Sequence, residues 1–261
     1  MMGKNSPEER TSKHPHIKIV GISGMPEVRE GDQLAKEITK AAAAQGTPIE
    51  NQDIVVVTQK IVSKAEGRTI DLTSINPSAY ATKFANQSGR DPRLVELVLQ
   101  ESLSIVRSDP VRGILITETT HGFICANAGI DASNVPGNEM VTLLPKDPDT
   151  SASRILYKLG KKVGVIISDT FGRAWREGHV NFAIGVAGMD AIQDYRGQSD
   201  HTGQEINVTQ IAVADELASA SELVMGKIAK IPVAVVKGYT FTDGNLGTAS
   251  LLRDRSMDLF R

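Results

Sequence analysis

Residues 53–58 read DIVVVT, a short apolar run between an aspartate and a threonine. A run of this length that is rich in β-branched residues is typical of a strand buried on both faces. Residues 163–167, VGVII, form a second run of the same kind. Nearer to the two ends of the chain, the apolar residues at 17–22 and at 232–236 predict two more strands. A polar turn is expected after the first run, at Gln59 and Lys60.

Helices are predicted from the spacing of apolar residues and from the residues that begin and end them. Asp32 is the expected cap of a helix that runs to Gln45. The pairs NP at 76–77 and DP at 91–92 each place a proline at the first helical position after a cap. The remaining predicted elements are helices at 151–159 and 213–225, and strands at 112–118 and 123–126.

Strands and helices mix along the chain without a regular alternation. This pattern favours an α+β, mixed α/β fold with irregular sheets and flanking helices over a doubly wound sheet. The 261 residues suit one large domain or two lobes that share a core. Residues 1–15 are polar and show no period, so we expect a disordered tail before a single catalytic domain at 16–261. Neither G-x-x-x-x-G-K-[ST] nor G-x-G-x-x-G occurs, so the two standard nucleotide motifs are absent.

The charge balance narrows the class of partner. The chain has 29 basic and 31 acidic residues, which argues against binding to nucleic acid or to a membrane surface. Its single cysteine, Cys125, excludes an intrachain disulfide and lies in an apolar stretch where burial is expected. No apolar run is long enough for a membrane helix, and the first residues do not resemble a secretory signal, so we expect a cytoplasmic protein.

The first candidate site segment is NAGIDASN, residues 127–134. Small residues there would let a ligand approach the backbone. Asp131 offers a hard carboxylate for Mg²⁺ or Mn²⁺, and Asn134 offers an amide for a base or a sugar. An ordinary capped turn is the alternative interpretation, because the same residue types form turns.

The second candidate segment is IISDTFGR, residues 166–173, in which polar residues follow an apolar strand. The carboxyl ends of strands are where open α/β sheets bind ligands. Asp169 can hold a divalent ion with Thr170 as a second oxygen donor, and Arg173 can clamp a phosphate or a carboxylate. The alternative is a surface turn capped by the aspartate.

The third candidate segment is TQKIVSKAEGR, residues 58–68. Lys60 and Lys64 could meet a polyphosphate as point charges. A solvated face is the alternative, and for a short run of charges it is the more common outcome.

Together these segments resemble the coenzyme F420-0:gamma-glutamyl ligase family. The resemblance runs through G-M-P at 24–26, SKAEGR at 63–68, NAGIDASN at 127–134, LLPKDPD at 143–149 and SDTFGR at 168–173. Their order and spacing fit over about residues 16–238. The resemblance implies a mixed α/β fold particular to the family and an intertwined homodimer.

The resemblance also implies roles for individual residues. It implies metal ligation by Asp131, Asp169 and Thr170. It implies nucleotide contacts from Met25, Pro26, Glu27, Val28, Gln59, Lys60, Lys64 and Asn134, and from a final loop that begins at Met225 and Gly226. Family members carry an acidic metal ligand after that glycine, whereas this chain has Lys227. A lysine cannot bind a cation, so we predict that Lys227 meets a nucleotide phosphate.

The implied reaction activates the carboxylate of coenzyme F420-0 with GTP and joins it to L-glutamate. The implied ions are Mg²⁺ or Mn²⁺, with K⁺ as a further candidate. Arg173 is our candidate for holding the acceptor carboxylate or the glutamate. Two alternatives remain open: a nucleotide- or metabolite-binding regulatory module without turnover, and an amide ligase of the same fold with another carboxylate substrate.

Overall fold

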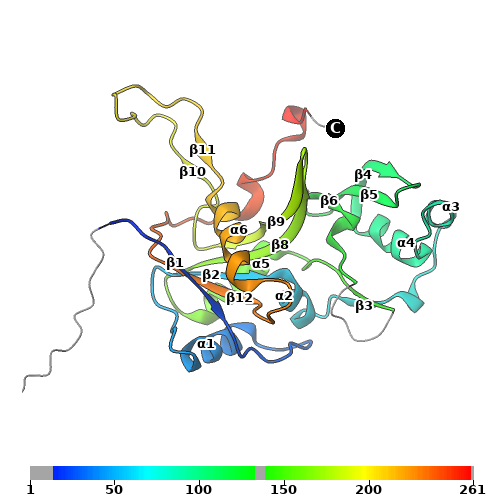
Figure 1. The fold of residues 1–261 in the computed structure, drawn as a ribbon, viewed down its shortest axis with the longest axis horizontal. Helices are drawn as coiled ribbons and strands as arrows, with labels where there is room; N and C mark the ends of the chain where they lie inside the picture. The colour runs from blue at the N-terminus through cyan, green and yellow to red at the C-terminus, as the bar shows by residue number, and fades with distance from the viewer. Residues whose placement is uncertain (1–13, 133–138, 260–261) are drawn as a thin grey trace, which may run out of the picture.

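The computed structural model describes residues 14–132 and 139–259, and it is an α+β protein with several sheets, as predicted (Figure 1). A five-stranded sheet has the order β1-β12-β2-β8-β9. Its strands are β1 (Lys18–Ile22), β12 (Val233–Lys237), β2 (Ile54–Thr58), β8 (Gly164–Arg173) and β9 (Arg176–Ala187). The two apolar runs, β2 and β8, are parallel neighbours, and the other neighbouring pairs are antiparallel.

Helices cover both faces of this sheet. Because side chains alternate along a strand, Val55 and Val57 pack in one core and Ile54 and Val56 in the other. The first core includes residues of α1 (Leu34–Ala44), α2 (Gln59–Ala65) and α5 (Pro148–Leu159). The second includes residues of α6 (Val213–Met225). All four residues of the β2 run are 0% exposed, which confirms the strand predicted to be buried on both faces.

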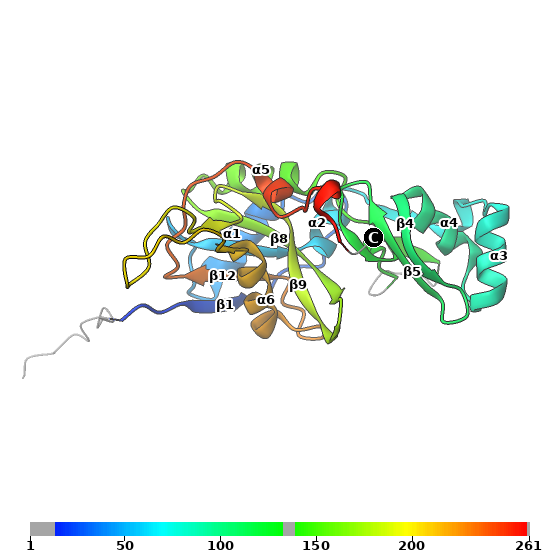
Figure 2. The ribbon, with the colours of Figure 1, turned by 90° about the horizontal axis from the view of Figure 1, so that it is seen from above.

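A smaller lobe forms one end of the molecule (Figure 2). Its strands are β3 (Thr69–Asp71) and β7 (Met140–Thr142), which pair with each other, and β4 (Ser102–Asp109), β5 (Ile114–Thr119) and β6 (Ile124–Ala126), which form an antiparallel sheet. Its helices are α3 (Ala79–Ser88), α4 (Pro92–Gln100), and the single turns η1 (Leu72–Ser74) and η2 (Asn127–Gly129). Two small apolar clusters hold this lobe together.

The remaining elements lie at the periphery of the larger lobe. They are the two-residue strands β10 (Gln193–Asp194) and β11 (Gln210–Ile211) and the short helices η3 (Gly247–Ser250) and η4 (Arg255–Met257). Among the described residues, no helix has the length and apolar character needed to cross a membrane.

Two predicted helix caps are wrong. Asp32 does not cap α1, because its Oδ2 accepts a hydrogen bond from the Arg29 amide at 2.8 Å and the helix begins only at Leu34. The NP pair at 76–77 lies outside α3, which Ser78 caps by accepting a hydrogen bond from the Ala81 amide. The DP pair is confirmed, since Asp91 caps α4 and Pro92 is its first residue.

Other predictions fail at element boundaries. The turn expected at Gln59 and Lys60 is instead the first turn of α2. The second apolar run does not end before Asp169, because β8 continues to Arg173 and turns into β9. The helix expected from Ser151 begins at Pro148, although it ends before Gly160 as predicted. The predicted helix at 213–225 is confirmed as α6.

Candidate active site

The junction between β2 and α2 presents two lysines to neighbouring acids. Lys60 and Lys64 are four residues apart in α2 and therefore lie on one side of the helix. The Lys60 ammonium pairs with Asp131 at 2.7 Å, and the Lys64 ammonium pairs with Glu27 at 2.5 Å. Lys64 holds the pKa of the Glu27 carboxyl below its usual range, and the charge of Lys230 lowers this pKa further without a direct contact. The segment at 25–28 and the loop after α6 are therefore near each other.

A left-handed turn precedes Asp131. Asn127, Ala128 and Gly129 have φ values of 56°, 53° and 70°. Such a turn is disfavoured for residues with a Cβ, so the surroundings must hold it in place. Arg90 donates a hydrogen bond to the Asn127 side-chain oxygen at 2.8 Å. Asp131 then forms an isolated bridge with Thr142 and exchanges two backbone hydrogen bonds with it.

Asp169 is a partly buried carboxylate within β8. Burial raises its pKa to about 7, a hydrogen bond from the Thr170 amide opposes this, and the Asp131 charge raises it further. The positive charges of Lys227 and Lys60 lower the pKa of Asp169. The two acids predicted to bind metal therefore lie close enough to interact, although one belongs to the smaller lobe and the other to the five-stranded sheet.

Thr170 projects from the opposite face of β8, toward α6. Its hydroxyl donates to the Asn181 side chain at 2.7 Å, and Asn181 in turn donates to Glu222 at 3.1 Å. The Lys227 ammonium donates a hydrogen bond to the Thr170 hydroxyl at 2.5 Å. Because neighbouring residues of a strand point to opposite faces, Asp169 and Thr170 do not face one common point.

The donor set fits a hard divalent cation that a phosphate helps to hold. The described residues contain no group of three or more His, Cys, Asp or Glu side chains placed to bind a metal. Mg²⁺ is commonly bound by one or two carboxylates together with substrate phosphates, so Asp131 and Asp169 suffice for such a site. A cation there would also favour the ionised form of Asp169, whose pKa is raised by burial and by the Asp131 charge.

Several of the expected nucleotide-binding side chains are buried. Val28, Gln59 and Met225 are 5%, 2% and 1% exposed, so a ligand could reach only their backbone groups. Met25 is partly buried against the core, whereas Pro26 and Glu27 are exposed. Gly226 ends α6 with a φ of 57°. Asn134 lies outside the described residues, so its expected contact stays a prediction.

Arg173 lies at the far end of β8, where the hairpin turns. Its guanidinium donates to the Glu177 carbonyl at 2.7 Å, and its buried Nε has no hydrogen-bond partner. No described contact joins it to Asp131 or Asp169, and its role stays a prediction. Trp175, at the tip of the same hairpin, is 80% exposed.

Sequence reasoning missed Asn181 and Glu222, which complete the hydrogen-bonded network around Thr170. Asn181 lies in β9, a strand that was not predicted, and Glu222 is one of several acids on a predicted helix. Cys125 is buried as expected, and burial together with the Asp169 charge raises the pKa of its thiol to about 12. The thiol is therefore protonated at neutral pH, which argues against a nucleophilic role.

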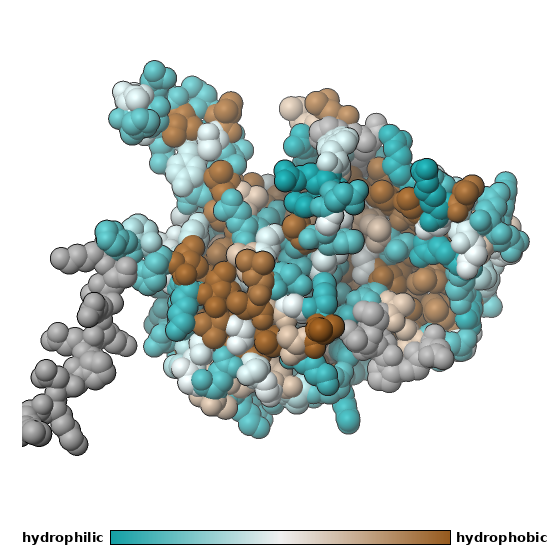
Figure 3. Space-filling view, in the orientation of Figure 1, coloured by the Kyte–Doolittle hydropathy of each residue, from teal (hydrophilic) through white to brown (hydrophobic). Residues whose placement is uncertain are grey.

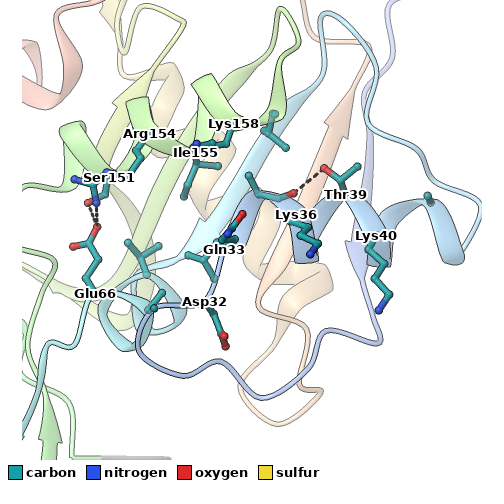
Figure 4. Close-up of a pocket in the computed structure, with 17 residues that line it drawn as sticks. Asp32, Gln33, Lys36, Thr39, Lys40, Glu66, Ser151, Arg154, Ile155 and Lys158 are labelled. Carbon is teal, nitrogen blue, oxygen red and sulfur yellow. Dashed lines mark hydrogen bonds and ion pairs between the residues drawn. The ribbon is translucent and has the colours of Figure 1, made fainter.

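A cavity of about 640 Å³ lies between α1 and α5 (Figure 4). Its floor is apolar, and its rim carries the cations Lys36, Lys40, Arg154 and Lys158. At this cavity, Glu66 accepts a hydrogen bond from the Ser151 hydroxyl at 2.5 Å. Glu66 belongs to the third candidate segment, and this contact connects that segment to α5. None of the described residues that line the cavity belongs to the cluster around Asp169, so the candidate chemistry lies elsewhere.

Most of the chain is similar to known proteins. A family model described as F420-0:Gamma-glutamyl ligase matches residues 23–238. A coenzyme F420:L-glutamate ligase of Methanothermobacter thermautotrophicus is 45% identical over 254 residues, which cover 94% of this chain and 99% of that protein. Proteins of the same name from Methanocaldococcus jannaschii and Methanopyrus kandleri are each 40% identical, over 94% and 95% of this chain and 97% and 98% of their own lengths.

Proposed function

Because the chain belongs to the F420-0:gamma-glutamyl ligase family, we propose that it joins L-glutamate to the carboxylate of coenzyme F420-0 in F420 biosynthesis, with GTP as the energy source. It is a ligase by this membership. The observation that carries the nucleotide-dependent mechanism is the convergence of Asp131, Asp169, Lys60 and the Lys227–Thr170 pair. Two acids and two ammonium groups around this part of β8, distributed over its two faces, suit the binding of a polyphosphate with its metal ion.

The proposed reaction has two steps. The F420-0 carboxylate attacks the γ-phosphorus of GTP, so that an acyl phosphate forms and GDP leaves. The neutral amine of glutamate then attacks the acyl carbon, loses a proton, and displaces inorganic phosphate to form the amide. Placing the two reactants side by side and shielding the acyl phosphate from water are the main tasks of the protein.

Asp131 and Asp169 are the residues that would hold Mg²⁺ or Mn²⁺, which when bound neutralises phosphate charge. Lys60 is paired with Asp131 in the free chain, at 2.7 Å. Lys60 carries a flexible point charge beside these acids, and it would meet a phosphate oxygen of GTP. Lys64, whose side chain is 12% exposed and pairs with the exposed Glu27, would contact a phosphate in the same way. K⁺ stays a candidate ion without an assigned residue.

Lys227 contacts Thr170, the residue that the family resemblance assigns to a metal. Thr170 and Asp169 project from opposite faces of β8, so Thr170 would belong to a second ion position. We propose that the Lys227 ammonium supplies the positive charge at that position and contacts a phosphate of GTP. One fixed cation would thus replace one metal ion.

We further propose that the chain works as a homodimer. Exposed apolar side chains on the β4–β5–β6 sheet support this, namely Leu103 (65%), Ile105 (40%), Ile114 (42%) and Ile124 (41%). Exposed apolar side chains that lie close together are typical of a protein interface. A second apolar patch lies on the face that carries β1 and α6, with Ile17, Leu223 and Ile228 exposed (Figure 3).

The test is the mass of the product. Purified protein is incubated with F420-0, L-glutamate, GTP and Mn²⁺, and each component is omitted in turn. We expect a product heavier by one or more glutamate residues, with GDP and phosphate formed only when both F420-0 and glutamate are present. Parallel reactions with ATP decide the nucleotide. GTP binding without any product would favour the regulatory alternative, and product from another carboxylate would favour the second alternative.

A further inference from the structure

A second cavity, of about 300 Å³, is lined in part by Phe171 and Phe182 of the β8–β9 hairpin, which also carries Asp169. Its lining comes from four parts of the chain: the turn before β6, the β8–β9 hairpin, the beginning of α6 and the C-terminal segment at 251–258. Three phenylalanines, Phe123, Phe171 and Phe182, contribute to its wall. The chain has only six phenylalanines, so half of them line this one cavity.

The β8–β9 register connects this cavity to the candidate active site. Phe182 is directly opposite Asp169 in the antiparallel pair, and such opposite residues share a face of the sheet. Phe171 lies two residues after Asp169 and therefore on the same face. The rings of Phe171 and Phe182 are stacked, with centroids 5.8 Å apart and an angle of 25° between their planes. The aromatic wall therefore begins beside the Asp169 carboxylate.

The other walls suit a flat molecule with polar substituents. Leu251 and Leu252 of the C-terminal segment add apolar surface, and Arg253, Asp258 and Asp215 add polar groups. Asp215 is held by a hydrogen bond from the Ala183 amide at 2.9 Å. Small-molecule sites usually combine an apolar lining with a few polar groups of this kind.

The size and the position of the cavity distinguish its occupant from the nucleotide. A volume of about 300 Å³ is near the lower end for ligand sites, enough for a small ring system and too small for a nucleoside triphosphate with its ion. The Lys227–Thr170 pair projects from the other face of β8, so the proposed phosphate contact of Lys227 is separated from the aromatic wall. A carboxylate attached to an aromatic group in the cavity would be directed toward Asp169 and its proposed cation.

We propose that the cavity walled by Phe123, Phe171 and Phe182 binds the flat aromatic ring system of the carboxylate-bearing acceptor, an assignment that rests on the proposed ligase function. Stacking against the phenylalanines supplies affinity that does not depend on the nucleotide. The C-terminal segment forms one side of the cavity. Asp149 anchors η3, which leads into that segment, by accepting hydrogen bonds from the Thr248 amide and hydroxyl at 3.0 Å.

The test measures binding of the acceptor to Phe171→Leu and Phe182→Leu variants of the full chain. Isothermal titration with F420-0 in the absence of GTP gives the dissociation constant, and a separate titration with GTP and Mn²⁺ serves as the internal reference. We expect each substitution to weaken F420-0 binding about three- to tenfold, the scale of one aromatic contact, and to leave GTP binding unchanged. Phe84→Leu is the matched control, because Phe84 is buried in the smaller lobe. Thermal melting confirms that each variant is folded.

The outcomes separate this proposal from the proposed function. Unchanged F420-0 affinity and unchanged KM for F420-0 in both variants would overturn the cavity assignment even if the protein ligates glutamate. Weakened binding in both variants, with normal binding in Phe84→Leu, supports the assignment even if no glutamate is transferred and the ligase function fails. If the wild-type chain binds no F420-0 at all, the assignment is overturned with it.

Discussion

Asp169 is subject to opposite demands from folding and from chemistry. Burial and the Asp131 charge raise its pKa from the ordinary value of 3.8 to about 7 in the folded chain. A group whose folded pKa is raised favours the folded state most when it is protonated, so its cost to stability develops as the pH rises from about 4 to 7. Above that range, the ionised carboxylate destabilises the metal-free protein.

Asp169→Asn should therefore lose activity and gain stability. We expect ligation to fall about 100-fold or more, the scale of losing one electrostatic partner of the transition state. In the presence of a chelator the variant should melt above the wild type at pH 8, by about 2–4 °C for each kcal/mol gained, and the difference should shrink toward pH 5. Calorimetric melting curves and product assays check both parts.

The control for that experiment is Asp194→Asn in the exposed β10–β11 hairpin. Hydrogen bonds from Arg196 hold the pKa of Asp194 at about 2, so its substitution should not stabilise the protein at pH 8. Activity close to that of the wild type in Asp169→Asn at limiting Mn²⁺ would show that the metal assignment is wrong.

Lys227 tests the proposal that a fixed ammonium replaces a second ion. Lys227→Ala should raise the apparent constant for GTP about tenfold, as expected for a charged hydrogen bond to a phosphate. Lys227→Glu should be worse at low Mn²⁺ and should recover as Mn²⁺ rises, because a carboxylate beside Thr170 can recruit an ion. GTP titrations at several Mn²⁺ concentrations measure both effects. Equal GTP constants for Lys227→Ala, the wild type and the remote control Lys40→Ala would leave Lys227 as an ordinary surface residue.

At the scale of elements, the contact between α5 and β9 depends on one glycine. A Cβ at Gly185 would lie 2.4 Å from the Pro148 carbonyl oxygen, a backbone atom that cannot rotate away. Gly185→Ala should therefore destabilise the protein by about 1–3 kcal/mol, as overpacking typically does. Gly172→Ala is the matched control in β8, because a Cβ there meets nothing within 4 Å. Urea unfolding of the two variants measures the difference, and equal free energies of unfolding would contradict the close approach.

At the scale of the whole molecule, the expected homodimer should be detected by light scattering. We expect the double variant Leu103→Glu/Ile105→Glu to be monomeric at micromolar concentration, because charges on the β4 face would be buried in the interface. Leu223→Glu, on the exposed surface of α6, should remain dimeric. A monomeric wild type would remove the dimer proposal, and loss of the dimer only in Leu223→Glu would move the interface to α6.

Local sequence patterns were sufficient to predict elements in which each face has the same surroundings along its whole length. The β2 run predicted its strand because all four apolar side chains are buried whichever way they point. The α6 helix was predicted over its full length because one face packs on the sheet and the other faces away, which leaves a helical period in the sequence. The short helix α2 was missed because Gln59, Lys60 and Lys64 are typical of a polar turn, although Gln59 is buried and both lysines are largely covered in ion pairs.

The sequence by itself determined the fold class, the family, and the acids, lysines and hydroxyl that are the candidates for the chemistry. Only the tertiary structure decided that Asp131 is paired with Lys60 and lies near Asp169. It also decided that Thr170 contacts Lys227 on the opposite face of β8, and that Arg173 lies in the β8–β9 hairpin. It also placed Phe182 opposite Asp169. The physical reason is that such contacts depend on strand order and register, which the whole core sets and no local period records.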